Sequence, residues 1–298
     1  MGTFYGEARS NVLKTWALLT FFALLLIGVG FAISLATGDM IILYLAVIIA
    51  AISSFVSYWK SDKIVLRMNN AVEADEKEYP RLHNLVENLA IAQGLPKPDL
   101  YIIKEKQPNA FATGRNPEHS VIAVTEGLLE RLEKSELEAV LAHELAHIEN
   151  RDVLVSTVAV VLAGAIAIVS RIFLRSMLFG RRRSSNSKSG GIKLIIGVVV
   201  AIIAPIFAMM IKYAISRKRE YLADSSAVLN TRYPEGLASA LEKISSDPNE
   251  IKGANEATAN LYIANPLRGD ENKGLLKKLF MTHPPVEERI EKIRKIDV

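Results

Sequence analysis

The sequence lacks cysteine altogether, although it is 298 residues long. Disulfide bonds, thiolate zinc ligands and cysteine nucleophiles are therefore excluded, and any metal site has to use His, Asp or Glu side chains. Histidine is also scarce, with five residues in the chain. A metal-binding pattern that uses two of them therefore has a small chance of arising by accident. The lack of cysteine alone does not identify a compartment.

Charge is missing from two long stretches near the N-terminus, 15–38 and 40–59, which have 24 and 20 residues. Half of the whole chain is hydrophobic, and each stretch is long enough to cross a hydrocarbon core of about 30 Å. Because only Asp39 separates them, they predict a transmembrane helical hairpin within an N-terminal segment 1–60. A cleaved signal peptide is the alternative for the first stretch, but its apolar part exceeds the usual length.

Charges flank this hairpin asymmetrically, since the connecting turn carries only Asp39. Basic residues precede and follow the two stretches: Arg9, Lys14, Lys60, Lys63 and Arg67. The positive-inside rule then predicts that both ends lie in the cytoplasm. Aromatic residues of the kind that anchor helices at the membrane interface lie at the same boundary: Trp16, Tyr58 and Trp59.

The net charge of +4 originates in one segment. Residues 171–193 contain seven basic residues and no acidic ones, and elsewhere 29 basic residues face 32 acidic ones. A nucleic-acid-binding face would combine basic and aromatic residues on a folded surface, which this Ser- and Gly-rich segment does not offer. We therefore expect no nucleic-acid partner.

Residues 61–152 have the charged, turn-containing sequence of a soluble α+β unit. Their pattern predicts these elements: an amphipathic helix over 71–93 with an interruption at Pro80, strands over 100–103 and 121–125, and a helix that begins at 128 and leads into the next one. Between the strands lie Asn109, Ala110, Phe111 and Ala112. They indicate either an edge strand, on which an extended peptide can pair, or an ordinary strand and turn.

The pattern His-Glu-x-x-His occurs at His143, Glu144 and His147. Residues four apart share a helical face, so both imidazoles can bind one metal ion, with Glu144 placed to act as general base. Ser135 and Glu138 have the capping-box spacing at the start of this helix. A surface helix with two solvated histidines is the alternative.

A catalytic zinc site needs a third protein ligand and an open position. Glu220 and Asp224 lie near the start of a second soluble, mostly helical segment, 216–298, and share a helical face. Glu220 could complete the site, while Asp224 accepts a hydrogen bond from the outer nitrogen of a ligand histidine. The alternative is a solvated pair that interacts with Lys or Arg.

Two more apolar stretches, 153–170 and 194–211, have 18 uncharged residues each and form a predicted segment 153–215. Because the metal ligands on either side of this segment have to meet, either both stretches cross the membrane or neither does. Crossing places Arg181, Arg182 and Arg183 outside, against the positive-inside rule. A hairpin in or on the membrane places them near anionic headgroups. We favour two spans, because each stretch is uncharged over a bilayer thickness.

Near the C-terminus, His283 precedes two prolines and an amphipathic helix over 286–294. It could point into a cleft and donate to the oxyanion of a tetrahedral intermediate. Arg289 could do the same, or hold its helix by an ion pair. A capping histidine and a surface arginine are the structural alternatives. His83 and His119 are not assigned to the site.

With these apolar hairpins and motifs in this order, the chain resembles the HtpX family of prokaryotic membrane-bound zinc metalloproteases, which are related to CAAX prenyl endopeptidases. The resemblance covers nearly the whole chain and depends on four segments: 109–114, 143–152, 219–224 and 283–289. It implies a mainly α integral membrane protein that carries an α+β, gluzincin-like zincin domain. It also implies one zinc ion on His143, His147 and Glu220, with Glu144 as base and Asp224 beside the ligands.

The same resemblance implies a substrate-aligning edge near Asn109 and Ala112, and His283 matches a motif of the family. Members cleave damaged or misassembled membrane proteins on the cytoplasmic side of the cell membrane, so the lipid bilayer and unfolded proteins are the expected partners. A narrow-specificity, prenyl-type processing endopeptidase is the alternative. A membrane protein that transports zinc without hydrolysis is disfavoured, because transport calls for ionisable groups inside the apolar stretches, which have no charge.

Overall fold

The computed structural model describes residues 4–164, 217–249, 251, 254, 258–266 and 284–298. Every structural statement below concerns these residues. The apolar stretch 194–211, the basic residues Arg181–Arg183 and His283 lie outside them, so the predictions for these parts of the chain remain predictions.

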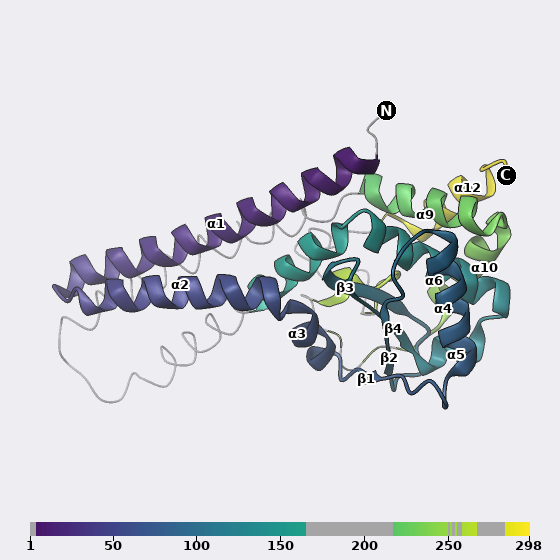
Figure 1. Ribbon diagram of the computed structural model, residues 1–298, viewed down its shortest axis with the longest axis horizontal. Coiled ribbons are helices and arrows are strands. Elements are labelled where there is room, and N and C mark those ends of the chain that lie inside the picture. The colour runs from purple at the N-terminus through teal and green to yellow at the C-terminus, as the bar shows by residue number, and fades with distance from the viewer. Residues whose placement is uncertain (1–3, 165–216, 250, 252–253, 255–257, 267–283) are drawn as a thin grey trace.

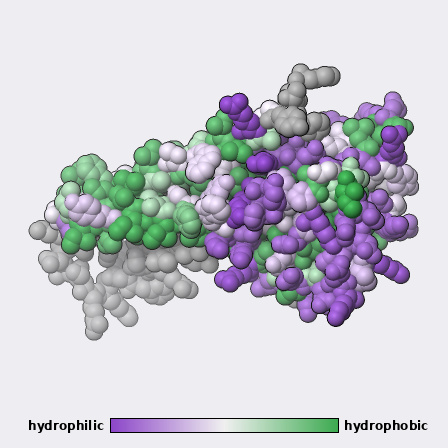
Figure 2. Space-filling view, in the orientation of Figure 1, coloured by the Kyte–Doolittle hydropathy of each residue, from purple (hydrophilic) through white to green (hydrophobic). Residues whose placement is uncertain are grey.

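A long helical hairpin extends from one end of the molecule (Figure 1). It consists of α1 (Phe4–Thr37) and α2 (Ile41–Trp59). Gly38 adopts a positive φ of 73° in the turn, and the Asp39 carboxylate accepts a hydrogen bond from the Ile41 N–H at 2.9 Å. Among the described residues, two stretches are long and apolar enough to cross a membrane, Ala8–Leu35 and Ile41–Trp59. The predicted N-terminal hairpin is therefore present, and its surface is largely hydrophobic (Figure 2).

A four-stranded mixed sheet forms the centre of the other end of the molecule. Its strands are β1 (Val72–Glu73), β2 (Asp99–Ile103), β3 (Ala110–Asn116) and β4 (His119–Thr125), in the order β1-β2-β4-β3. β2 and β4 are parallel, and the outer pairs are antiparallel. β3 is thus an end strand of this sheet, as the edge-strand interpretation expected.

Helices cover both faces of the sheet. The larger core contains side chains of α4 (Pro80–Ala92), α6 (Lys134–Glu149), α9 (Arg217–Thr231), α10 (Pro234–Ser246) and α12 (Val286–Arg294). The opposite face packs against α3 (Ser61–Met68), the helical segment Asp152–Gly164 and Tyr262 beside η2 (Thr258–Leu261). Segments before and after the undescribed part of the chain therefore share one hydrophobic core.

Two local predictions are wrong. The helix expected over 71–93 begins only at Pro80, a favourable first helical position, because residues 72–73 pair with β2 instead. The capping box of α6 is formed by Glu133 and Glu136 rather than by Ser135 and Glu138. Glu136 is also held by Lys243 of α10 at 2.7 Å, so a tertiary contact fixes where α6 begins. The preceding helix, α5 (Glu126–Arg131), ends before α6.

The hairpin is attached directly to the helix that carries the histidines. Asn11 of α1 donates to the backbone carbonyl of Asn150, the residue after α6, at 3.0 Å. Apolar side chains of α1 pack against the segment Asp152–Gly164: Leu18, Leu19 and Phe22 against Leu154, Val155 and Val158. The predicted interfacial aromatics also gather here, since Trp16 stacks on Tyr58 with ring centroids 5.4 Å apart.

Candidate active site

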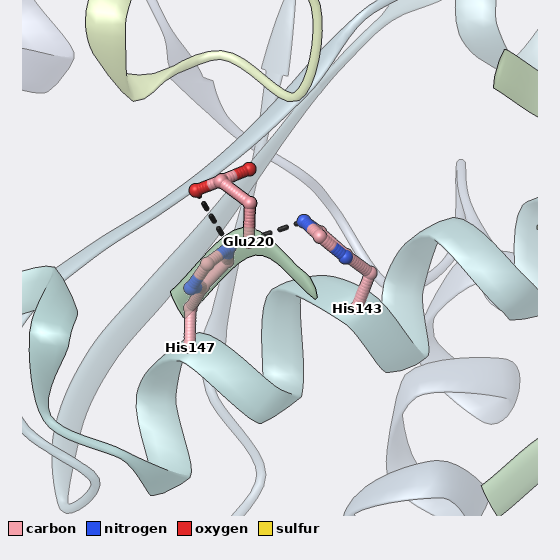
Figure 3. Close-up of side chains that lie close together, drawn as sticks. All are labelled: His143, His147 and Glu220. Atoms are coloured by element: carbon pink, nitrogen blue, oxygen red, sulfur yellow. Dashed lines mark hydrogen bonds and ion pairs between the residues drawn. The ribbon is translucent and has the colours of Figure 1, made fainter. Parts of the chain in front are cut away.

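Two histidines and a glutamate converge from two helices (Figure 3). His143 and His147 lie one turn apart on α6, and Glu220 lies near the start of α9. The two Nε2 atoms are 3.1 Å apart, and Glu220 Oε1 is 3.7 Å from His147 Nε2. One donor atom from each of the three residues can be chosen so that all lie within 4.8 Å of one another. The structure therefore brings together the three residues expected to bind a metal.

Each histidine faces a carboxylate with its outer nitrogen. His143 Nδ1 lies 3.0 Å from Asp224 Oδ1, the position expected for Asp224. His147 Nδ1 lies 3.1 Å from Asp152 Oδ2. The His147 contact has hydrogen-bond geometry, whereas His143 Nδ1 lies close to its carboxylate without meeting that geometry. A carboxylate at Nδ1 favours the proton there and leaves the Nε2 lone pair available to the shared point.

Asp152 had no role assigned from the sequence. The helix α6 ends at Asn150, and Arg151 adopts a left-handed φ of 55°. This turn brings Asp152, five residues after His147, back to the imidazole. The available signal was an acidic residue directly after the end of the histidine helix, but its orientation depends on the backbone turn at Arg151.

The convergent groups suit a divalent cation. Two imidazole lone pairs 3.1 Å apart repel each other unless a proton or a metal ion lies between them. Tetrahedral zinc with bonds of 2.0–2.1 Å would separate such ligands by about 3.4 Å. The charged groups on or beside the cavity leave two negative charges when both histidines are neutral: Glu144, Asp152, Glu220 and Asp224 against Arg219 and Arg289. Without a metal, burial would lower the pKa of His147, but Asp152, Glu220 and Glu144 raise it to about 10.

Glu144 lines the same small cavity, which has a volume of about 40 Å³. Its side chain is buried. Burial, together with the nearby Glu220, raises the pKa of Glu144 to about 7, although His147, the Ala112 amide and Arg289 favour its charged form. A carboxylate with a pKa near neutrality can take and return a proton, which is the property a general base requires.

Arg289 is fully buried behind the ligands. It donates to both oxygens of Asp224, from Nε at 2.9 Å and Nη2 at 2.7 Å, and from Nη1 to the Ile263 carbonyl at 2.9 Å. Although burial would raise the pKa of Asp224, Arg289 and His143 lower it to about 2. Of the two roles considered for Arg289, these are the contacts of an ion pair that holds its helix.

Of the four residues expected to form the substrate edge, three contact other parts of the protein and one lines the cavity. Asn109 is buried and donates to the Ala264 carbonyl at 2.9 Å, and the Ala110 carbonyl accepts from Ile263 N–H at 2.9 Å. Phe111 packs edge-on against Tyr262 on the opposite face of the sheet. Ala112 alone among these residues lines the cavity.

Comparison with known proteins assigns this arrangement to a family. A model of "Peptidase family M48" matches residues 76–297. The chain belongs to peptidase family M48. A "Protease HtpX homolog" of Caldanaerobacter subterraneus subsp. tengcongensis is 44% identical over 302 residues, which cover 99% of each chain. One of Syntrophobacter fumaroxidans is 47% identical and covers 94% of this chain and 98% of its own. One of Pyrococcus furiosus is 46% identical, with 95% of each chain covered.

Family M48 membership makes the chain a metallopeptidase, a hydrolase of peptide bonds. Together with the two long apolar helices, the HtpX relatives indicate a membrane protein. The predicted resemblance to the HtpX family is therefore confirmed. Among solved structures, the crystal structure of S. mikatae Ste24p has a TM-score of 0.47 and 18% identity, with 96% of this chain and 66% of that chain covered. This likeness is too low to add to the assignment.

Proposed function

We propose that this family M48 chain is a zinc-dependent integral-membrane endopeptidase with a zincin-type domain. His143, His147 and Glu220 would hold the metal and leave a position open for water and substrate. The observation that carries the proposal is the pair of Nε2 atoms 3.1 Å apart, each backed by a carboxylate at Nδ1. Arrangements of carboxylate, histidine and zinc have this form in metalloenzymes.

Zinc, when bound, polarises the scissile carbonyl and lowers the pKa of water toward about 7. Glu144 takes the proton from the attacking water and returns it to the leaving amine. Asp224 and Asp152 fix the orientation of the two imidazoles, and Arg289 keeps Asp224 charged. His283, which lies outside the described residues, remains the predicted donor to the oxyanion.

The edge of β3 would align the substrate. Thr125 N–H donates to the Asn109 carbonyl, so by antiparallel alternation the main-chain groups of Ala112 face away from β4. Ile263 already occupies this edge at Ala110, and the edge passes Glu144 at Ala112. An extended peptide paired on the part of this edge beyond Ile263 would thus lie in front of the base.

We further propose that the substrates are misfolded or damaged membrane proteins, cleaved on the cytoplasmic side of a prokaryotic membrane by a multi-pass enzyme. The attachment of α1 to the end of α6 through Asn11 and Asn150 supports an active site close to the bilayer. The basic residues that flank the hairpin support the cytoplasmic orientation.

Offering a prenylated peptide beside an unmodified unfolded protein tests the narrow-specificity alternative. That alternative predicts that the prenylated peptide is cleaved and the unfolded protein is not.

Glu220→Gln tests the metal assignment. We expect zinc affinity to fall by more than about 100-fold, because replacing a residue that only hydrogen-bonds to a metal ligand already costs about 10–100-fold. Proteolysis should disappear together with the zinc. Zinc content by mass spectrometry and cleavage of casein measure both. Glu242→Gln, an exposed glutamate on α10, is the control. A Glu220→Gln protein that kept full zinc content would contradict the assignment.

Asp152→Asn tests the carboxylate that the sequence did not reveal. Asparagine keeps the size but removes the charge beside His147 Nδ1, so zinc affinity should fall about 10–100-fold. Competition with a chelator measures the affinity, and the exposed Asp297→Asn is the control. Equal affinities in the two variants would remove Asp152 from the site.

A further inference from the structure

Arg219 is a buried arginine in the first turn of α9, directly before Glu220. Only 8% of the residue is exposed. Its Nε and Nη1 atoms are buried without a hydrogen-bond partner, and no salt bridge to it is found, within the part of the chain that the structure describes. Arg219 lines the same cavity as His143, Glu144, His147 and Glu220.

Two buried guanidinium nitrogens without a partner are unfavourable, because their lost hydration is not replaced. Buried polar groups in native proteins are therefore almost always paired, and an exception calls for a reason. Arg289 shows how this chain pairs such a group, since it has the carboxylate of Asp224 and the carbonyl of Ile263. Arg219, on the side that faces the cavity, has no comparable acceptor among the described residues.

Two carboxylates that line the cavity already contact other side chains. Asp152 lies beside His147, and Glu220 lies near His147 and Arg289. Within the part of the chain that the structure describes, neither carboxylate is directed at Arg219, and a molecule that enters the cavity can supply an acceptor. A peptide paired on β3 in front of Glu144 brings main-chain carbonyl oxygens there, and a guanidinium N–H forms a strong charge-assisted hydrogen bond with such an oxygen.

We propose that Arg219 binds a main-chain carbonyl oxygen of the substrate next to the scissile bond; this rests on the proposed function of the site. The role differs from that of Arg289, whose donors are directed at Asp224 and Ile263. Arg219 would orient the peptide relative to Glu144 and would recognise the backbone, not a particular side chain. Through this contact the enzyme would accept an extended peptide substrate whatever its side chains.

The test uses full-length, zinc-loaded enzyme in detergent and peptides blocked at both ends. Arg219→Met should lower kcat/KM about 10–100-fold, the effect of losing a hydrogen bond to a charged group. Zinc content should be unchanged. The melting temperature should be equal or higher, because the variant no longer buries an unpaired charge. Arg217→Met, at an exposed position on the same helix, should behave as wild type.

Chemical rescue distinguishes binding from a structural role. Adding guanidinium ion to Arg219→Ala should restore part of the rate, since the ion can occupy the vacated space and donate to the same oxygen. Loss of zinc or a lower melting temperature in Arg219→Met would overturn the proposal in favour of a structural arginine. A rate loss confined to peptides with a free terminal carboxylate would overturn it too, because the acceptor would then be that carboxylate.

The failure of this inference is distinguishable from failure of the proposed function. If Arg219→Met cleaves blocked peptides at the wild-type rate while Glu144→Gln is inactive, the assignment of Arg219 is wrong and the proposed function stands. If Glu144→Gln is itself fully active, the proposed function is wrong, and the assignment of Arg219 is wrong with it.

Discussion

Replacing Glu144 with Gln is expected to lower the rate of peptide hydrolysis by about 10²–10⁴-fold, the usual contribution of general acid–base catalysis. Glutamine has nearly the same size but cannot take a proton from water. Glu144 is not one of the three convergent donors, so zinc should remain bound. The buried carboxylate, whose pKa burial raises to about 7, is removed without leaving a cavity.

Cleavage of casein or of a model membrane protein, together with zinc content, measures this effect. Glu138→Gln is the matched control, because Glu138 is a partly buried residue on the same helix and does not line the cavity. A Glu144→Gln protein that cleaved as fast as wild type would sink the mechanism. Loss of zinc in this variant would instead indicate that Glu144 is a metal ligand.

Arg289→Met should destabilise the folded protein by about 3–5 kcal/mol, the cost of removing one partner from a buried ion pair. Arg289 is fully buried and makes a two-point contact with Asp224. Without it, the charges of Asp224, Glu220 and Glu144 are crowded in a buried site. Thermal unfolding in detergent measures the loss.

Two further variants sharpen this result. Arg294→Met on the same helix removes exposed ion pairs with Glu235 and Glu242 and should change stability little. The double variant Asp224→Asn/Arg289→Met should be more stable than Arg289→Met alone, because the uncompensated charge is gone. If Arg289→Met unfolded at the wild-type temperature, the ion-pair role would be wrong and a role toward substrate would return.

The features that could be predicted from the sequence depend on local patterns. The hairpin α1–α2 follows from two uncharged stretches separated only by Asp39. The pairing of His143 with His147 follows from the period of a helix. Glu220 could be predicted because a catalytic zinc site needs a third protein ligand besides the two histidines.

The features that could not be predicted depend on contacts between distant segments. The start of α6 is fixed by Glu136, whose carboxylate contacts Lys243 of another helix. Residues 72–73 form a strand because they pair with β2, against their helical pattern. Asp152 reaches His147 only through the left-handed turn at Arg151. The burial of Arg289 depends on packing that no local pattern encodes.

The hydrogen bond between Asn11 and Asn150 links the predicted interfacial end of α1 to the end of the helix that carries the histidines. Asn11 precedes Trp16 by five residues, about 7.5 Å of helix, and Asn150 follows His147 by three, about 4.5 Å. In the proposed orientation, with Trp16 at the headgroup level, these two lengths limit the separation between the interface and the ligands to at most about 15 Å. An extended chain covers that length in about three to five residues. If the proposed substrates and orientation are right, we expect cleavage sites in membrane proteins to lie within a few residues of the point where the chain leaves the lipid.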